Sequence, residues 1–193
     1  RLNAAGTGLL GSTYLGGSST ELGVGGIDAN ANGDVWVVGS TSSSNYPFLN
    51  PFAGTQTSLT AGSTDPVITG LRSDHTVSFA GGYLGGNTTD QAFAVTIDQS
   101  GLDFHVAGVT FSSTFPICTG AGTMLNGNAN NSCTVAGFDT TFNSSSDGYV
   151  MRIANTLRVV ASTYVGGTST DQFFAVDRIG NDTVAFGNTL SNA

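Results

Sequence analysis

The sequence predicts an all-β protein built from repeated four-stranded antiparallel units, and three observations support this class. An aromatic–aliphatic–Gly-Gly segment occurs three times, beginning at Tyr14, Tyr83 and Tyr164. Each copy is followed by two short apolar runs separated by a turn rich in Asp, Asn and Gly, which is the pattern of a β-hairpin. No segment shows the 3.6-residue apolar period of an amphipathic helix. We therefore expect strands and turns throughout the chain.

The first hairpin of each unit carries acids at recurring places. An acid follows each tyrosine by seven positions, at Glu21, Asp90 and Asp171. A second aspartate follows thirteen to fifteen positions after the tyrosine, at Asp28, Asp98 and Asp177. Each hairpin closes on a glycine, namely Gly39, Gly108 or Gly187. This regularity predicts that the three hairpins share one structure.

A second hairpin completes each unit after a long polar excursion. The apolar pattern resumes at Asp65 and Asp147, and its last strand runs into the next Tyr-x-Gly-Gly segment. We expect residues 1–193 to be a single repeat region, with long loops at 40–64 and 109–146. The expected unit boundaries lie near 1–22, 23–91, 92–172 and 173–193. The first and last units lack strands, so we expect further blades of a longer chain, or other copies of the chain, to complete them.

Four antiparallel strands per repeat are the unit of a β-propeller blade. The stretch "STYLGG", the acid seven positions after its tyrosine, the glycines of "GGIDANANGDVWVVGST" and the later proline resemble the bacterial SBBP repeat, a family named for seven-bladed β-propellers. The resemblance covers nearly the whole chain except the two long loops, and departs from the family at Glu21 and Val165. It implies propeller blades in a secreted bacterial protein. The alternative is a parallel β-solenoid, for which repeats of 69 and 81 residues are too long and uneven.

Composition limits the classes of partner. Charged residues make up 9% of the 193 residues, against roughly 25% in an average soluble protein, and the formal net charge is −8 with no lysine. Such an acidic chain repels phosphate backbones, so no nucleic-acid partner is expected. Divalent ions or cationic groups suit this charge better. No apolar run reaches the roughly 18 residues of a membrane helix, so no membrane span is expected.

The two cysteines indicate an oxidising environment. Cys118 and Cys133 lie fifteen positions apart in a Gly/Asn-rich loop, and no histidine stands near them to complete a zinc site. We predict that they form a disulfide, which indicates an extracellular or cell-surface location. Four Asn-x-Ser/Thr sequons are candidate glycosylation sites: Asn87, Asn130, Asn143 and Asn181.

Two interpretations are open for the repeated acids Glu21, Asp90 and Asp171. As a row of carboxylates on the face that carries the long loops, they would bind a cation or a sugar. Alternatively, each accepts hydrogen bonds from N–H groups of its own Gly-Gly turn. Recurrence in every copy favours the second interpretation, because a unique ligand site does not need one acid per repeat. For Tyr46 and Phe48, core packing is the default interpretation, and a platform on which a carbohydrate would stack is the alternative.

One segment matches part of a calcium-binding loop. Residues 28–34, "DANANGD", reproduce the first half of the D-x-[DN]-x-[DN]-G pattern. The candidate ligands are Asp28, Asn30, Asn32 and Asp34. The twelfth position is Gly39 instead of glutamate, so the usual bidentate ligand is missing. Calcium is thus a candidate cofactor, and an ordinary hairpin turn is the alternative.

No catalytic constellation stands out. The two histidines differ in context, His75 in a turn and His105 on an expected strand, so a Ser-His-Asp triad or a histidine metal cluster has no support. We therefore expect a non-catalytic extracellular protein with a structural or adhesive role, in one version a fibre subunit in which one copy completes the last blade of the next. A carbohydrate-binding propeller module and a propeller hydrolase or lyase are the alternatives.

Overall fold

The computed structural model describes residues 1–23, 25–47, 58–60, 62–74, 78–98, 103–125, 133–143, 145–154, 156 and 158–192. These residues contain thirteen β-strands and no helix, and all strand pairs within the sheets are antiparallel. The all-β prediction is therefore confirmed. The assignment of these sheets to propeller blades stays a prediction. No helix among the described residues is long and apolar enough to span a membrane.

The first sheet contains strands from residues 21 to 83. Its strands are β1 (Glu21–Leu22), β2 (Ile27–Ala29), β3 (Val35–Thr41), β4 (Asp65–Leu71) and β5 (Ser78–Tyr83). The order is β1-β3-β4-β5, and β2 also pairs with β3. The β2–β3 turn is tight because Gly33 adopts φ +81°, a left-handed conformation that glycine enters without steric cost.

The second sheet is the best buried. It consists of β6 (Asp90–Ile97), β7 (Asp103–Thr110), β10 (Asp147–Ala154) and β11 (Arg158–Val165), in the order β11-β10-β7-β6. The first sheet packs against β6 on one side, and β12 packs against β6, β7 and β10 on the other. Because both faces are covered, β7 is buried at every position from Phe104 to Thr110. Trp36 of β3 stacks on Phe104 at 4.5 Å between ring centroids, which joins the two sheets.

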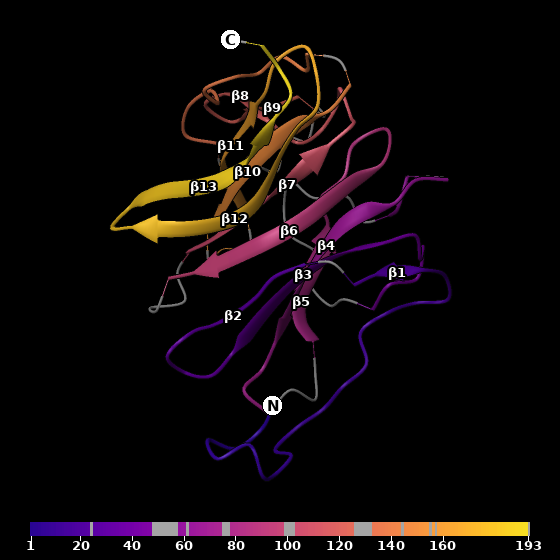
Figure 1. Cartoon of the computed structure of the whole chain (residues 1–193), viewed down its shortest axis with the longest axis vertical. Coiled ribbons are helices and arrows are strands. Elements are labelled where there is room, and N and C mark those ends of the chain that lie inside the picture. Colours follow the sequence, from indigo (N-terminus) through magenta and orange to yellow (C-terminus); the bar gives the residue numbers. More distant parts are fainter. Residues whose placement is uncertain are drawn as a thin grey trace.

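A two-stranded hairpin follows, formed by β12 (Asp171–Ile179) and β13 (Asp182–Thr189). Figure 1 shows the three sheets in succession, with β6 lying between the first sheet and the yellow hairpin. Among the described residues, β13 pairs with β12 alone, whereas its counterpart β7 pairs with both β6 and β10. Large apolar side chains are exposed on this hairpin and directly after it: Phe174, Ile179, Val184, Phe186 and Leu190. Phe174 is nevertheless stacked on Phe93 of β6, at 5.8 Å between ring centroids.

Two segments differ from the pattern expected of them. The region 109–146, predicted as a loop, contains a small hairpin of β8 (Cys118–Gly120) and β9 (Thr123–Met124), whose turn holds Gly122 at φ +68°. Residues 10–20, which include the first Tyr-x-Gly-Gly segment, form no strand. The equivalent residues in β5 and β11 pair with β4 and β10, and the first copy has no such neighbour among the described residues.

Candidate functional site: the acid-capped turns

The three repeated acids occupy equivalent positions, each at the first residue of a strand. Glu21 begins β1, Asp90 begins β6 and Asp171 begins β12. Each carboxylate accepts a hydrogen bond from the N–H of the second glycine in its Tyr-x-Gly-Gly segment. The donors are Gly17 at 2.7 Å, Gly86 at 2.8 Å and Gly167 at 2.8 Å. We call these three structures the acid-capped turns.

A serine after the following long strand closes each acid-capped turn. Its hydroxyl donates to the same carboxylate oxygen, from Ser43 at 2.6 Å, Ser112 at 2.8 Å and Ser191 at 2.8 Å. The same hydroxyl oxygen accepts from a backbone N–H in the turn, that of Ser19, Thr88 or Ser169. Asp90 and Asp171 are buried and Glu21 is half-buried. These contacts favour the structural interpretation of the acids over an open carboxylate row.

Two further acids, Asp65 and Asp147, lie beside the acid-capped turns. They begin β4 and β10, and both are fully buried. Asp65 accepts from the Ser63 hydroxyl at 3.0 Å and from the Thr60 N–H at 3.2 Å. Burial raises the pKa of each of these two carboxyl groups to about 6. Neither was predicted as a site residue, although both stand where the apolar pattern resumes after the long loop.

Each of these acids lies next to the acid of the following turn. A Cβ atom at Gly85 would collide with the Asp65 carboxylate. A Cβ atom at Gly166 would collide with Asp147 Oδ1 and would lie 2.9 Å from Asp171 Oδ2. The first glycine of the motif is therefore required for space in these two copies, because the backbone passes close to one carboxylate at Gly85 and to two at Gly166.

Replacing Asp65 by asparagine is expected to stabilise the protein increasingly as the pH rises from about 4 to about 6. Burial raises the pKa of Asp65 from its ordinary 3.8 to about 6 in the folded protein. The protonated carboxyl group therefore contributes fully to stability below about pH 3.8, and this contribution is lost as the pH rises to about 6. The asparagine side chain is neutral at every pH and retains an acceptor for the Thr60 N–H. Urea unfolding at several pH values measures the difference in free energy between the two proteins.

The difference in stability between the Asp65→Asn variant and the unaltered protein reports on Asp65 alone, because other groups that titrate over the same pH range are present in both proteins. Burial lowers the pKa of His105 to about 4, and this group acts with the opposite sign over the same range. The turn hydrogen bonds leave the pKa of Glu21 and of Asp171 below their ordinary values, although burial itself opposes this. A stability difference that does not change between pH 4 and 6 would contradict the assignment.

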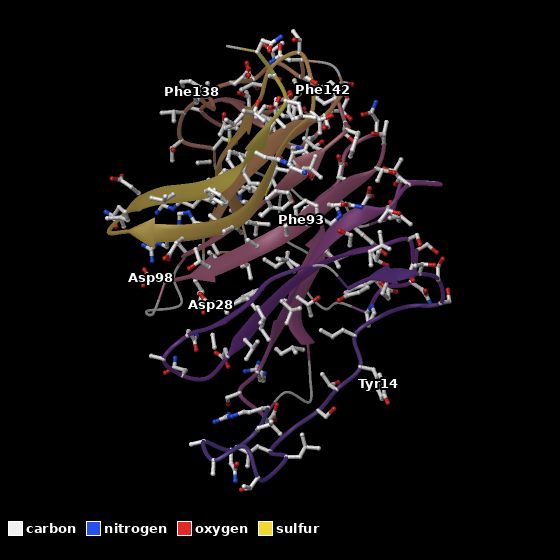
Figure 2. All side chains as sticks on the ribbon, in the orientation of Figure 1. Tyr14, Asp28, Phe93, Asp98, Phe138 and Phe142 are labelled. Carbon is white, nitrogen blue, oxygen red and sulfur yellow. A yellow bond between two sulfur atoms is a disulfide. The ribbon has the colours of Figure 1, made fainter. Side chains whose placement is uncertain are left out.

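The calcium-like segment is a hairpin turn tied to two neighbours. Asp28 Oδ2 accepts from the Ile97 N–H at 2.8 Å, which joins β2 to the end of β6 (Figure 2). The side chain of Asn30 accepts from the N–H groups of Asn32 and Asp34, both at 3.0 Å. Asp34 Oδ1 accepts from Ser73 N–H at 3.1 Å. In the described part of the chain, no group of three or more His, Cys, Asp or Glu side chains is arranged to hold a metal.

Of the two aromatic candidates, Tyr46 lies in a small core and not on an open platform. Tyr46 is 9% exposed and packs with Val67 and Tyr83, and its hydroxyl accepts from Thr69 Oγ1 at 3.2 Å. The proposed stacking role of Tyr46 is therefore not supported, because its ring faces a small core. Phe48 lies outside the described residues.

The remaining candidate residues are the two cysteines, the four sequons and the two histidines. Cys118 and Cys133 form a disulfide with a Cα–Cα distance of 5.7 Å. Of the sequons, Asn87 and Asn181 are exposed, Asn143 is half-buried, and Asn130 lies outside the described residues. His105 is buried, with Nδ1 2.6 Å from Thr183 Oγ1. His75 also lies outside the described residues.

The fold and these turns define a class: an antiparallel β repeat protein in which a carboxylate and a serine hydroxyl close each Gly-Gly turn. A scan against protein-family models finds no match to this chain, and a search of curated proteins finds none. The similarity to the SBBP repeat therefore stays a prediction from the residues that carry it.

Proposed function

We propose that this protein is a non-catalytic, extracellular structural repeat protein whose propeller-type blades are completed by strands of a neighbouring copy. The disulfide supports an oxidising location. The main support is a difference among three equivalent tyrosines. Tyr83 and Tyr164 are buried, and their hydroxyls donate to the carbonyls of Ser43 at 2.6 Å and Ser112 at 2.9 Å. Tyr14 is fully exposed and points away from the sheets (Figure 2).

The acceptor that Tyr14 would use is identified by the repeat. Ser43, Ser112 and Ser191 hold the same place in the three acid-capped turns. Two of these serines receive a tyrosine hydroxyl on their carbonyl, and no tyrosine of the described residues donates to Ser191. The first Tyr-x-Gly-Gly segment thus has a tyrosine without its serine, and the last acid-capped turn has a serine without its tyrosine. These two surfaces are complementary.

The free edge of β13 supports the same conclusion. An edge strand presents N–H and C=O groups that can pair with another strand. Phe186 and Leu190, near this edge, are 72% and 68% exposed, so added strands would also cover apolar surface. Because the two surfaces differ, a contact between them is heterologous and leaves a new copy of each surface free. Such a contact propagates into a fibre unless rotation closes it into a ring.

Tyr14→Ala is expected to reduce assembly strongly, because it removes the side chain that enters the seam between copies. Electron microscopy and sedimentation velocity over a range of concentrations measure the effect. Phe138→Ala is the matched control, since Phe138 is also an aromatic residue with high exposure (92%, against 101% for Tyr14) but lies outside the repeated Tyr-x-Gly-Gly segments. Small monodisperse particles of the unaltered protein at every concentration would contradict the proposal, as would equal effects of the two variants.

A further inference from the structure

The burial of three equivalent strands changes from one end of the fold to the other. Strands β3, β7 and β13 are the second strands of the three repeated hairpins, and each contains a closing glycine. β7 is buried on both faces from Phe104 to Thr110, because β-structure packs on each side of it. β3 alternates between half-buried and buried residues, and β13 between exposed and half-buried ones. A strand shows this alternation when one of its faces is covered. In the described part of the chain, the first sheet and the last hairpin thus each keep one face that no other sheet covers.

The two junctions inside the chain are built from the same pair of positions. The residue three places before the closing glycine of one hairpin contacts the residue four places before the closing glycine of the next. At the first junction, Trp36 stacks on Phe104 at 4.5 Å between ring centroids. At the second junction, His105 Nδ1 lies 2.6 Å from Thr183 Oγ1. Successive hairpins therefore pack in one register, whether the contact is apolar or polar.

Continued by one step, this register pairs Val184 of β13 with Val35 of β3. These residues stand three and four places before Gly187 and Gly39, respectively. Both lie on the faces that no other sheet covers, at opposite ends of the succession of sheets (Figure 1). They can therefore meet only between two copies of the chain.

Both of these faces carry apolar side chains. We call Val184 and Phe186 the β13 face, and Ile27, Val35 and Val37 the β2–β3 face. Phe186 is 72% exposed and Ile27 is 70% exposed. Val95, the equivalent of Ile27 in the second sheet, is only 7% exposed because the first sheet covers it. Removal of such apolar surface from water favours association, so each face favours a partner.

A groove of about 550 Å³ lies over the β2–β3 face, between this face and residues 11–15. Its apolar lining consists of Leu15, Ile27, Val35, Val37 and Leu71. At the first junction, the equivalents of these five residues lie in one buried cluster together with Trp36 and Val38: Leu84, Val95, Phe104, Val106 and Ile153. The groove is therefore the space that Trp36 and Val38 fill at the first junction. Their equivalents in the last hairpin are the two residues of the β13 face.

We propose that the β13 face of one copy docks in the groove over the β2–β3 face of a second copy. This inference rests on the proposed function, because it names the surface on which copies of the chain assemble. It is continuous with the contact between Tyr14 and Ser191: Leu15, next to Tyr14, lines the groove, and Ser191 follows β13 by two residues. A single interface therefore contains both contacts.

Cross-linking of two cysteine variants tests the register of this contact. Val184→Cys and Val35→Cys are prepared separately, mixed, and treated with a short bismaleimide, which suits sheets that pack about 10 Å apart. A cross-linked dimer is expected in the mixture and not in either variant alone. The two native cysteines form a buried disulfide and do not compete for the reagent. Val135→Cys mixed with Val184→Cys is the matched control and should give no dimer, since Val135 is 64% exposed but lies on neither face.

Sedimentation velocity separates the failure of this inference from the failure of the proposed function. Phe186→Asp is expected to raise the concentration needed for half-assembly by at least about tenfold, because docking would bury an unpaired charge in an apolar groove. Its melting temperature as a monomer should be unchanged, since Phe186 is exposed there. Phe138→Asp is the matched control and should assemble as the unaltered protein does.

The unaltered protein decides between the two failures. If it assembles but the mixture of Val184→Cys and Val35→Cys gives no dimer, or if the two aspartate variants have equal effects, this inference is overturned and the proposed function stands. If the unaltered protein does not assemble at any concentration, the proposed function is overturned, and this inference with it.

Discussion

Asp90→Ala is expected to lower the free energy of unfolding by about 3–4 kcal/mol, because it breaks a buried hydrogen-bond network. The carboxylate is fully buried and accepts four hydrogen bonds. The donors are the N–H groups of Gly86 at 2.8 Å and Phe111 at 3.1 Å, and the hydroxyls of Thr110 at 2.5 Å and Ser112 at 2.8 Å. Alanine leaves these buried donors without an acceptor, and the free-energy penalty of several unpaired donors is larger than the loss of a single hydrogen bond.

Glu21→Ala is the matched control for this substitution. Glu21 holds the same position in the first acid-capped turn, but its side chain is half-buried, so water can reach the donors that lose their acceptor. We expect a loss of about 1 kcal/mol, typical of a single exchanged hydrogen bond. Denaturant unfolding followed by circular dichroism measures both variants. If Asp90→Ala were as mild as Glu21→Ala, the acids would not be structural, and the ligand-binding interpretation would regain support.

Loss of the disulfide is expected to cost about 3 kcal/mol, the value predicted for closing a loop of about fifteen residues. The cross-link also anchors the β8–β9 hairpin to the rest of the fold. Cys118 N–H donates to Ser162 Oγ at 2.8 Å, and Cys118 C=O accepts from Gly137 N–H at 2.7 Å. The Cys133 carbonyl accepts from Gly122 N–H at 2.9 Å. These contacts keep both ends of the bridge in the core.

The double variant Cys118→Ser and Cys133→Ser avoids leaving a reactive thiol. Its unfolding free energy should fall by the expected amount, and dithiothreitol should produce a similar loss in the unaltered protein but none in the variant. Both cysteines are buried, so reduction is expected to require local opening of the loop. A variant as stable as the parent would show that the contacts of Ser162 and Gly137 hold the loop without the bridge.

Much of the fold follows from short-range patterns. The β2–β3, β6–β7 and β12–β13 hairpins lie where alternating apolar residues flank an Asp/Asn/Gly turn, and the disulfide joins the two cysteines that the sequence contains. The β8–β9 hairpin was missed because its strands have only three and two residues. Strands this short carry too few side chains to show an alternation.

The site was harder to predict because its parts are distant in sequence. The role of Ser112 toward Asp90 depends on a contact across 22 positions, and that of Asp147 beside Asp171 depends on the meeting of two sheets. Serine is abundant in this chain, so its recurrence after each hairpin carried little signal. Tyr46 was open to two interpretations, core packing and a stacking platform, for a related reason. An aromatic ring in a polar loop resembles a ligand platform until tertiary packing shows that it is covered.

The three Tyr-x-Gly-Gly segments separate what the sequence determines by itself from what tertiary structure decides. Local chemistry determines the turn, because glycine leaves space for the backbone and a carboxylate four residues later accepts its N–H groups. These interactions lie within a few residues and form in all three copies. Burial of the tyrosine is decided elsewhere. Tyr83 and Tyr164 are covered because they lie on β5 and β11, which pair with β4 and β10, and their hydroxyls reach Ser43 and Ser112 across the fold. Tyr14 lies on no strand of the described residues and is exposed.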